Sequence, residues 1–70
     1  MERQPVKSSE ISSIGYDPKS KILEIEFRSG RIYQYLNVHE SEFKGLMTAS
    51  SHESYFQANI KNHYRGVKKR

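Results

Sequence analysis

The feature that most constrains this chain is the stretch of residues 22–36, ILEIEFRSGRIYQYL, in which polar and apolar side chains alternate on both sides of a glycine. Leu23, Ile25 and Phe27 alternate with charged residues, and this period of two is typical of a β-strand with one buried face. A second alternating segment follows Gly30. We therefore predict an antiparallel β-hairpin that turns at Gly30.

The length of the hairpin loop decides which face of the sheet carries Tyr33 and Tyr35, because a shift of one residue reverses the two faces of a strand. A two-residue loop puts both rings on the polar, solvent-facing side. A three-residue loop ending at Gly30 pairs Tyr33 with Ile25 and Tyr35 with Leu23, on the apolar side. We favour the three-residue loop, since its third position needs a positive φ and glycine adopts one without strain.

The rest of the sequence supplies one more strand and two helices. Asp17-Pro18 is typical of a tight turn, and beyond Leu36 the apolar residues change to a helical spacing, with Asn37 and the pair Ser50-Ser51 as candidate N-caps. We predict an α+β fold: a three-stranded antiparallel β-meander at about residues 11–16, 21–28 and 31–36, covered on one face by two short helices at about 39–49 and 52–63.

The length of 70 residues predicts a single small domain, and without cysteine it must be stabilised by packing of helices on the sheet. Residues 1–7 have no periodic pattern, so we expect a flexible lead-in there. We assign the domain to residues 8–64 and a basic C-terminal tail to residues 65–70.

The net charge of +4 is concentrated near the C-terminus. Residues 1–53 contain seven Lys or Arg and eight Asp or Glu, whereas residues 54–70 contain five basic residues and no acidic one. Such a segment either binds phosphates or acidic surfaces, or only keeps the protein in solution. The candidate nucleic-acid-binding residues are those of this segment and two arginines beside the hairpin turn: Lys61, Arg65, Lys68, Lys69, Arg70, Arg28 and Arg31.

Other chemistry has little support in the sequence. His39, His52 and His63 have no metal-binding spacing, and Glu24 and Glu26 alternate onto the predicted solvent face, where nothing raises their pKa values. There is no glycine-rich phosphate loop or nucleophile elbow. We therefore expect a non-enzyme with no cofactor, metal or small-molecule substrate. No apolar run exceeds three residues, so we expect no membrane contact and a cytoplasmic location.

Several short motifs occur in the order of a known family: Val6, Ser8 and Ser9, then Ile14-Gly15-Tyr16-Asp17, the Leu-x-Ile-x-Phe strand, Gly30, the Tyr33-Gln34-Tyr35 triplet, and finally Ala49, Ser51, Tyr55-Phe56 and Ile60. Over residues 6–64 the chain resembles the KTSC domain, which is found at the C-terminus of some lysyl-tRNA synthetases and as stand-alone small bacterial proteins. The attachment of this domain to tRNA synthetases suggests RNA binding as the role that the resemblance implies.

The chain departs from the family pattern at two positions. His39 stands where the family usually has proline, which leaves the start of the first helix less rigid. Glu53 stands where the family tends to have glycine, and its carboxylate disfavours a phosphate at the helix N-terminus beside Ser51.

Two hypotheses of function follow. The first is an RNA-binding accessory module that contacts backbone phosphates through the basic C-terminal segment, with Tyr33 and Tyr35 as structural residues rather than base-stacking ones. The second is a protein–protein interaction module that docks through an edge strand or a helical face.

Overall fold

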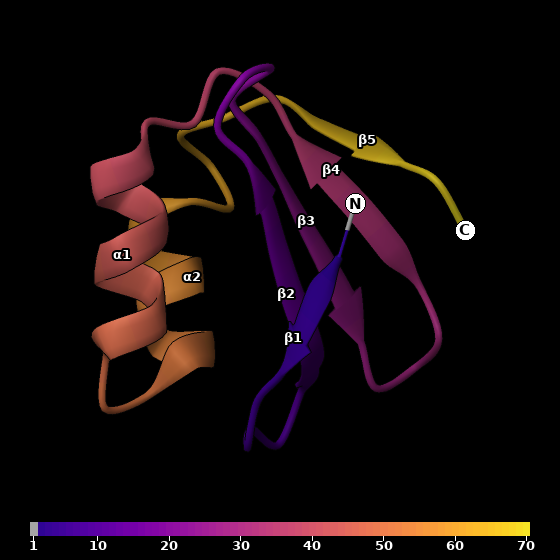
Figure 1. Cartoon of the computed structure of the whole chain (residues 1–70). Coiled ribbons are helices and arrows are strands. Elements are labelled where there is room, and N and C mark those ends of the chain that lie inside the picture. The colour runs from indigo at the N-terminus through magenta and orange to yellow at the C-terminus, as the bar shows by residue number, and fades with distance from the viewer. Residues whose placement is uncertain (1) are drawn as a thin grey trace.

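The computed structural model describes residues 2–70 and contains a five-stranded antiparallel sheet with two helices on one of its faces (Figure 1). The strands lie across the sheet in sequence order, so the α+β meander is confirmed, with two strands more than predicted. The elements are β1 (Arg3–Pro5), β2 (Ile11–Asp17), β3 (Ile22–Phe27), β4 (Ile32–Tyr35), α1 (Glu40–Thr48), α2 (His52–Asn59) and β5 (Gly66–Lys68).

The central hairpin of β3 and β4 has the predicted three-residue loop. Tyr33 pairs with Ile25 and Tyr35 pairs with Leu23. Gly30 adopts a φ of 96°, and its N–H donates to the Phe27 carbonyl at 2.9 Å. Both tyrosines consequently lie on the helix-facing side of the sheet. The Tyr35 residue is only 6% exposed, while Tyr33 is half-buried against the core.

Both ends of the chain differ from the prediction, since each forms an edge strand of the sheet. In the predicted lead-in, β1 pairs with β2 from Pro5–Ser13 to Arg3–Gly15. In the predicted tail, β5 pairs with β4. Neither segment has a recognisable strand period, and it is the hydrogen-bonding groups on the open edges of β2 and β4 that order them.

A β-bulge in β2 turns Ile11 and Ile14 to the same face of the sheet, although residues three apart in a regular strand point to opposite faces. Ile11 pairs with Phe27 and Ser13 pairs with Glu26, so Ser12 is an extra residue on its strand. Ile11 and Ile14 are therefore both fully buried beneath the helices.

The helices begin and end close to the predicted positions, with two corrections. The N-cap of α1 is His39 and not Asn37, which adopts a φ of 58° before the helix. Of the two serines predicted to cap α2, Ser51 does so, its hydroxyl accepting from the Ser54 N–H at 3.3 Å. This helix ends at Asn59, short of the predicted end at about residue 63, and the chain continues as turns. The polar sequence Lys61-Asn62-His63 lacks the apolar residues that would hold a further helical turn on the sheet.

The core lies between the helix-facing side of the sheet and the two helices. Its buried residues come from β2, β3, β4, both helices and the segments that follow β4 and α2. They are Ile11, Ile14, Leu23, Ile25, Tyr35, Val38, Leu46, Phe56 and Ile60.

Candidate nucleic-acid interface

The end of the chain brings basic residues from distant parts of the sequence together. In β5, Lys68 pairs with Tyr33, and beyond it the Lys69 N–H donates to the Ile32 carbonyl at 2.7 Å. The Ile32 N–H in turn donates to the Arg70 carbonyl at 3.0 Å. Residues 69–70 therefore lie beside Ile32, the chain neighbour of Arg31. Figure 1 shows this end of the chain along the outer edge of the sheet, next to β4.

All seven predicted basic residues are exposed, and most have no acidic partner within the described part of the chain. Among residues 2–70 the ion pairs within 4.0 Å involve only Arg3 and Arg70, the latter 3.5 Å from Glu26. Arg28 donates from Nε to the Ser8 carbonyl at 2.6 Å. Their charges are thus largely available to an external anion.

The predicted set divides in space. Lys61 follows α2 and lines the same groove as Gly66 and Tyr33, close to β5. Arg65 lies at the opposite end of β5, where its carbonyl accepts from the Leu36 N–H at 3.0 Å. We give the name basic edge to Arg31, Lys68, Lys69 and Arg70, which lie where the C-terminal segment pairs with the start of β4, together with Lys61, which lines the adjoining groove.

A groove lined by aromatic rings adjoins the basic edge. Its volume is about 430 Å³, and four of its residues are aromatic. Phe27 meets Tyr33 edge-on at a centroid distance of 6.0 Å, Tyr33 and Tyr35 stack at 6.3 Å, and Phe56 contacts both Phe27 and Tyr35 at 5.5 Å. We call this the aromatic groove. Sequence reasoning placed these rings on the apolar face and missed that part of that face stays open.

The aromatic groove also has polar lining residues. Glu10, Gln57 and Asn62 are exposed, and Glu53 is half-buried. The Glu53 carboxylate accepts a hydrogen bond from the Ser8 hydroxyl, and this bond is the main reason that its pKa is lowered. This departure from the family pattern therefore ties the start of α2 to the segment before β2.

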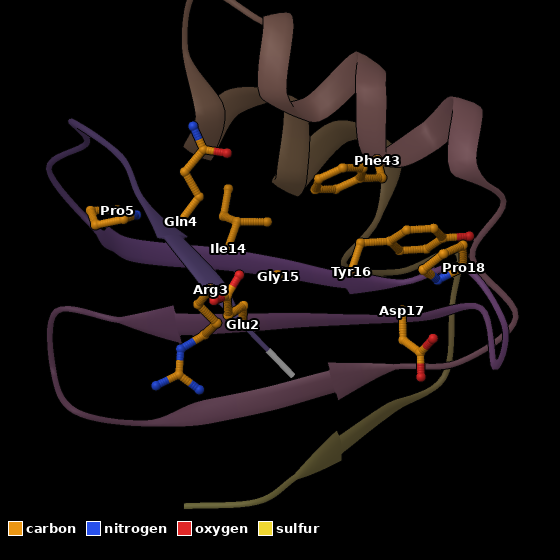
Figure 2. Close-up of a pocket in the computed structure, with 10 residues that line it drawn as sticks. All are labelled: Glu2, Arg3, Gln4, Pro5, Ile14, Gly15, Tyr16, Asp17, Pro18 and Phe43. Atoms are coloured by element: carbon orange, nitrogen blue, oxygen red, sulfur yellow. The ribbon is translucent and has the colours of Figure 1, made fainter.

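A second, wider groove lies between β1, β2 and α1 (Figure 2). Its volume is about 790 Å³, and the rings of Tyr16 and Phe43 stack within it at a centroid distance of 5.0 Å. None of the predicted basic residues lines it. Among its lining residues in the described range 2–70, Arg3 is the only cation, and it points away from the helices, toward the other strands (Figure 2). The Arg3 guanidinium donates to the Glu24 carboxylate there.

The face of the sheet opposite the helices carries a network of charged residues. Glu24 accepts from Arg3 and, at 2.8 Å, from the Gln34 amide; Glu26 accepts from the Ser13 hydroxyl at 2.8 Å. Glu24 was predicted to lie open to solvent, yet it is only 9% exposed, with the side chains of Arg3 and Gln34 bonded to its carboxylate. Burial acts to raise the pKa of Glu24, but the bonds from Gln34 and Arg3 outweigh it and the pKa is lowered.

The histidines and carboxylates of residues 2–70 form no cluster of three or more able to hold a metal ion. His52 instead lies with Nδ1 2.8 Å from the Leu46 carbonyl, between the two helices. In the same part of the chain, no helix has the length and apolar character needed to cross a membrane.

These observations define a small α+β domain in which two helices cover an antiparallel meander and a cationic segment forms the outermost strand. The model of the KTSC domain family matches residues 7–64. The chain therefore belongs to the KTSC domain family. Both edge strands, β1 and β5, lie outside the matched residues.

Relatives and a solved structure agree with this assignment. An uncharacterized protein of Stutzerimonas stutzeri is 41% identical over 66 residues, which are 93% of each chain. A protein of Tsukamurella paurometabola is 38% identical over 64 residues, covering 91% of this chain and 96% of the relative. The crystal structure of a KTSC domain protein from Yersinia pestis has a TM-score of 0.96 and 45% identity, over 99% of this chain and 97% of that one.

Proposed function

We propose that this protein is a non-enzymatic accessory module that binds RNA through backbone phosphates along the basic edge. One observation carries the proposal: the C-terminal segment is a strand paired with β4, and it holds Lys68, Lys69 and Arg70 beside Arg31. Cations fixed on a sheet lose less conformational freedom on binding than cations on a free tail. The proposal places the protein in the cytoplasm, where RNA is available.

Phosphate contacts of this kind bind with little sequence preference and depend strongly on salt. With four or five residues engaged, the logarithm of the binding constant falls with the logarithm of salt concentration at a slope of about −3 to −5. The measurement is a titration of labelled single-stranded and structured RNA into the full chain at several salt concentrations. Absence of binding at low salt would reject the proposal.

Substitutions test the basic edge better than truncation, because deleting residues 65–70 would remove β5 and expose β4. The test variant combines Lys61→Gln, Lys68→Gln and Lys69→Gln. The matched control combines substitutions of three other exposed lysines, Lys7→Gln, Lys19→Gln and Lys44→Gln.

Both triple variants lose the same charge, so only position distinguishes them. We expect the basic-edge variant to reduce the salt slope by about 2 and to weaken binding roughly 10- to 100-fold, with a much smaller effect in the control. Equal losses in the two variants would show that net charge alone attracts RNA, and would contradict the assigned surface.

Docking to a protein partner is the second candidate. The outermost strands β1 and β5 are the natural edges for such contact, but each has three residues, and they carry Pro5 and Lys68, which disfavour strand addition. A helical face remains as the other docking surface. Sedimentation at several concentrations tests self-association, and a pull-down without any reproducible partner would count against this candidate.

A further inference from the structure

We infer that the aromatic groove is a base-binding subsite, in which one unstacked nucleobase of a single-stranded RNA lies against Tyr33 while its flanking phosphates contact the basic edge. This inference rests on the proposed function and adds a second element to it. Phosphate binding alone needs no groove, whereas a base-binding subsite favours single strands over duplexes.

The groove is suited to a flat aromatic ligand. Its volume of about 430 Å³ lies within the range of roughly 300–1,000 Å³ in which proteins hold small organic groups. Tyr33 and Phe27 are partly exposed, and buried Tyr35 and Phe56 hold them in place by stacked and edge-to-face contacts. A π face fixed in this way stacks any of the four bases.

On the side of the groove next to β5, a glycine packs closely against one of the lining rings. A Cβ added to Gly66 would lie 2.8 Å from Cε1 of Tyr35, so any larger residue would press on the ring that supports Tyr33. Lys68 pairs with Tyr33, and paired residues of antiparallel strands project from the same face of the sheet. Lys61 lines the groove itself. Cations therefore flank the partly exposed ring of Tyr33.

The charges of the rim fix the direction of the ligand. Glu10 directly precedes β2, three strands from β5, and Glu53 accepts from Ser8 in the same segment. Both carboxylates line the groove and repel phosphate there, so the RNA backbone runs along Lys61 and Lys68 and the base points inward. Gln57 and Asn62 offer amide donors and acceptors to the polar edge of a base. An apolar peptide side chain would use neither the amides nor the lysines.

The first test compares two oligoribonucleotides of equal length and phosphate number, one with bases and one abasic. Both are titrated into the full chain at the same salt concentration. We expect the base-bearing strand to bind roughly 5- to 100-fold more tightly, the effect of one base–aromatic stack. Equal affinities would overturn the subsite and leave phosphate binding standing, whereas binding of neither strand would reject the proposed function itself.

The second test uses Tyr33→Leu, which keeps an apolar side chain but removes the stacking ring. The control is Phe43→Leu, which removes a ring from the wider groove. We expect Tyr33→Leu to abolish the preference for the base-bearing strand without changing the affinity for the abasic one, and Phe43→Leu to retain the preference. A preference that persists in Tyr33→Leu would overturn the subsite.

A measurement on the unsubstituted chain keeps the inference testable if Tyr33→Leu does not fold. Ring-proton NMR resonances of Tyr33 and Phe27 should move upfield when the base-bearing oligoribonucleotide is added and stay in place with the abasic one, since only a stacked base supplies a ring current. Unchanged resonances at saturating RNA would overturn the inference.

Discussion

The ring of Tyr35 in β4 lies directly against the backbone of Gly66 in β5, and a Cβ on the glycine would come within 2.8 Å of the ring. Tyr35 belongs to the buried core, and Gly66 is the first residue of the strand that carries the basic edge. The close approach thus joins the core to the candidate site.

Gly66→Ala should destabilise the protein by about 1–3 kcal/mol, because the added methyl group forces the Tyr35 ring or β5 to move. Urea unfolding of the two proteins measures the difference. In a Tyr35→Leu background, where the ring is absent, the same substitution should cost less. Additive effects in this double-mutant cycle would contradict the contact.

Gly45→Ala, in the middle of α1, should also destabilise the protein. Alanine normally stabilises a helix by about 1 kcal/mol relative to glycine, but here a steric clash outweighs that gain. The reason is Tyr55 of α2, whose ring carbon Cζ would lie 2.9 Å from the new Cβ, with its hydroxyl nearer still. Thermal unfolding measures the change. If Gly45→Ala raises Tm instead, the packing of the two helices described above is wrong.

Alkaline pH should weaken the contact between the helices. The hydrogen bond from the Tyr55 hydroxyl to Glu42 raises the pKa of Tyr55 from 10.0 to about 12, with burial as a smaller cause. Because the pKa is higher in the folded state, the bond contributes fully below about pH 10, and its contribution is lost as the pH rises toward about 12.

The measurement for this contact is a titration of tyrosinate absorbance, compared with that of Tyr55→Phe. We expect the variant to lack the step near pH 12. Its stability deficit at neutral pH should shrink above pH 10. A variant that lost a step near pH 10 instead would show that Tyr55 does not donate to Glu42.

Arg3→Gln should destabilise the protein by about 1–3 kcal/mol at neutral pH, because Glu24 is left buried without its cation. The pKa of Glu24 is lowered in the folded state, so this stabilisation is present above the ordinary value of 4.5 and is lost as the pH falls through the lowered pKa. The deficit should therefore be smaller at about pH 3.

Urea unfolding at the two pH values checks the Arg3 prediction. Arg31→Gln is the matched control, since Arg31 is exposed and has no acidic partner within 4.0 Å in the described chain; its effect should stay within about 0.5 kcal/mol. Equal effects of the two substitutions would mean that Arg3 does not hold β1 on the sheet.

The central hairpin was predictable because local rules determine it. Period-two alternation gave the strands, and the need for a positive φ at Gly30 gave the loop and the inward side of Tyr33 and Tyr35. Ser51 was predictable in the same way, as a side chain that caps the helix it precedes.

The edge strands were not predictable, because β1 and β5 are ordered by partners far away in the sequence. In the sequence, nothing distinguishes Arg3 from the other charged residues. Only the pairing of β1 brings its guanidinium to the Glu24 carboxylate. The basic residues of the C-terminal segment were predicted as binding residues, but as part of a tail. Their pairing with β4 through residues 66–70 decides which of them lie close to Arg31. The aromatic groove depends on how α2 covers the sheet, and no local pattern encodes that.

The most direct test of RNA binding at the basic edge is an amide NMR titration of the ¹⁵N-labelled full chain with single-stranded RNA at low salt. We predict that the shifts concentrate on Arg31, Tyr33, Lys61 and residues 66–70, and fade as salt is added. Shifts confined to β1 and α1 around the wider groove, or none at any RNA concentration, would contradict the account.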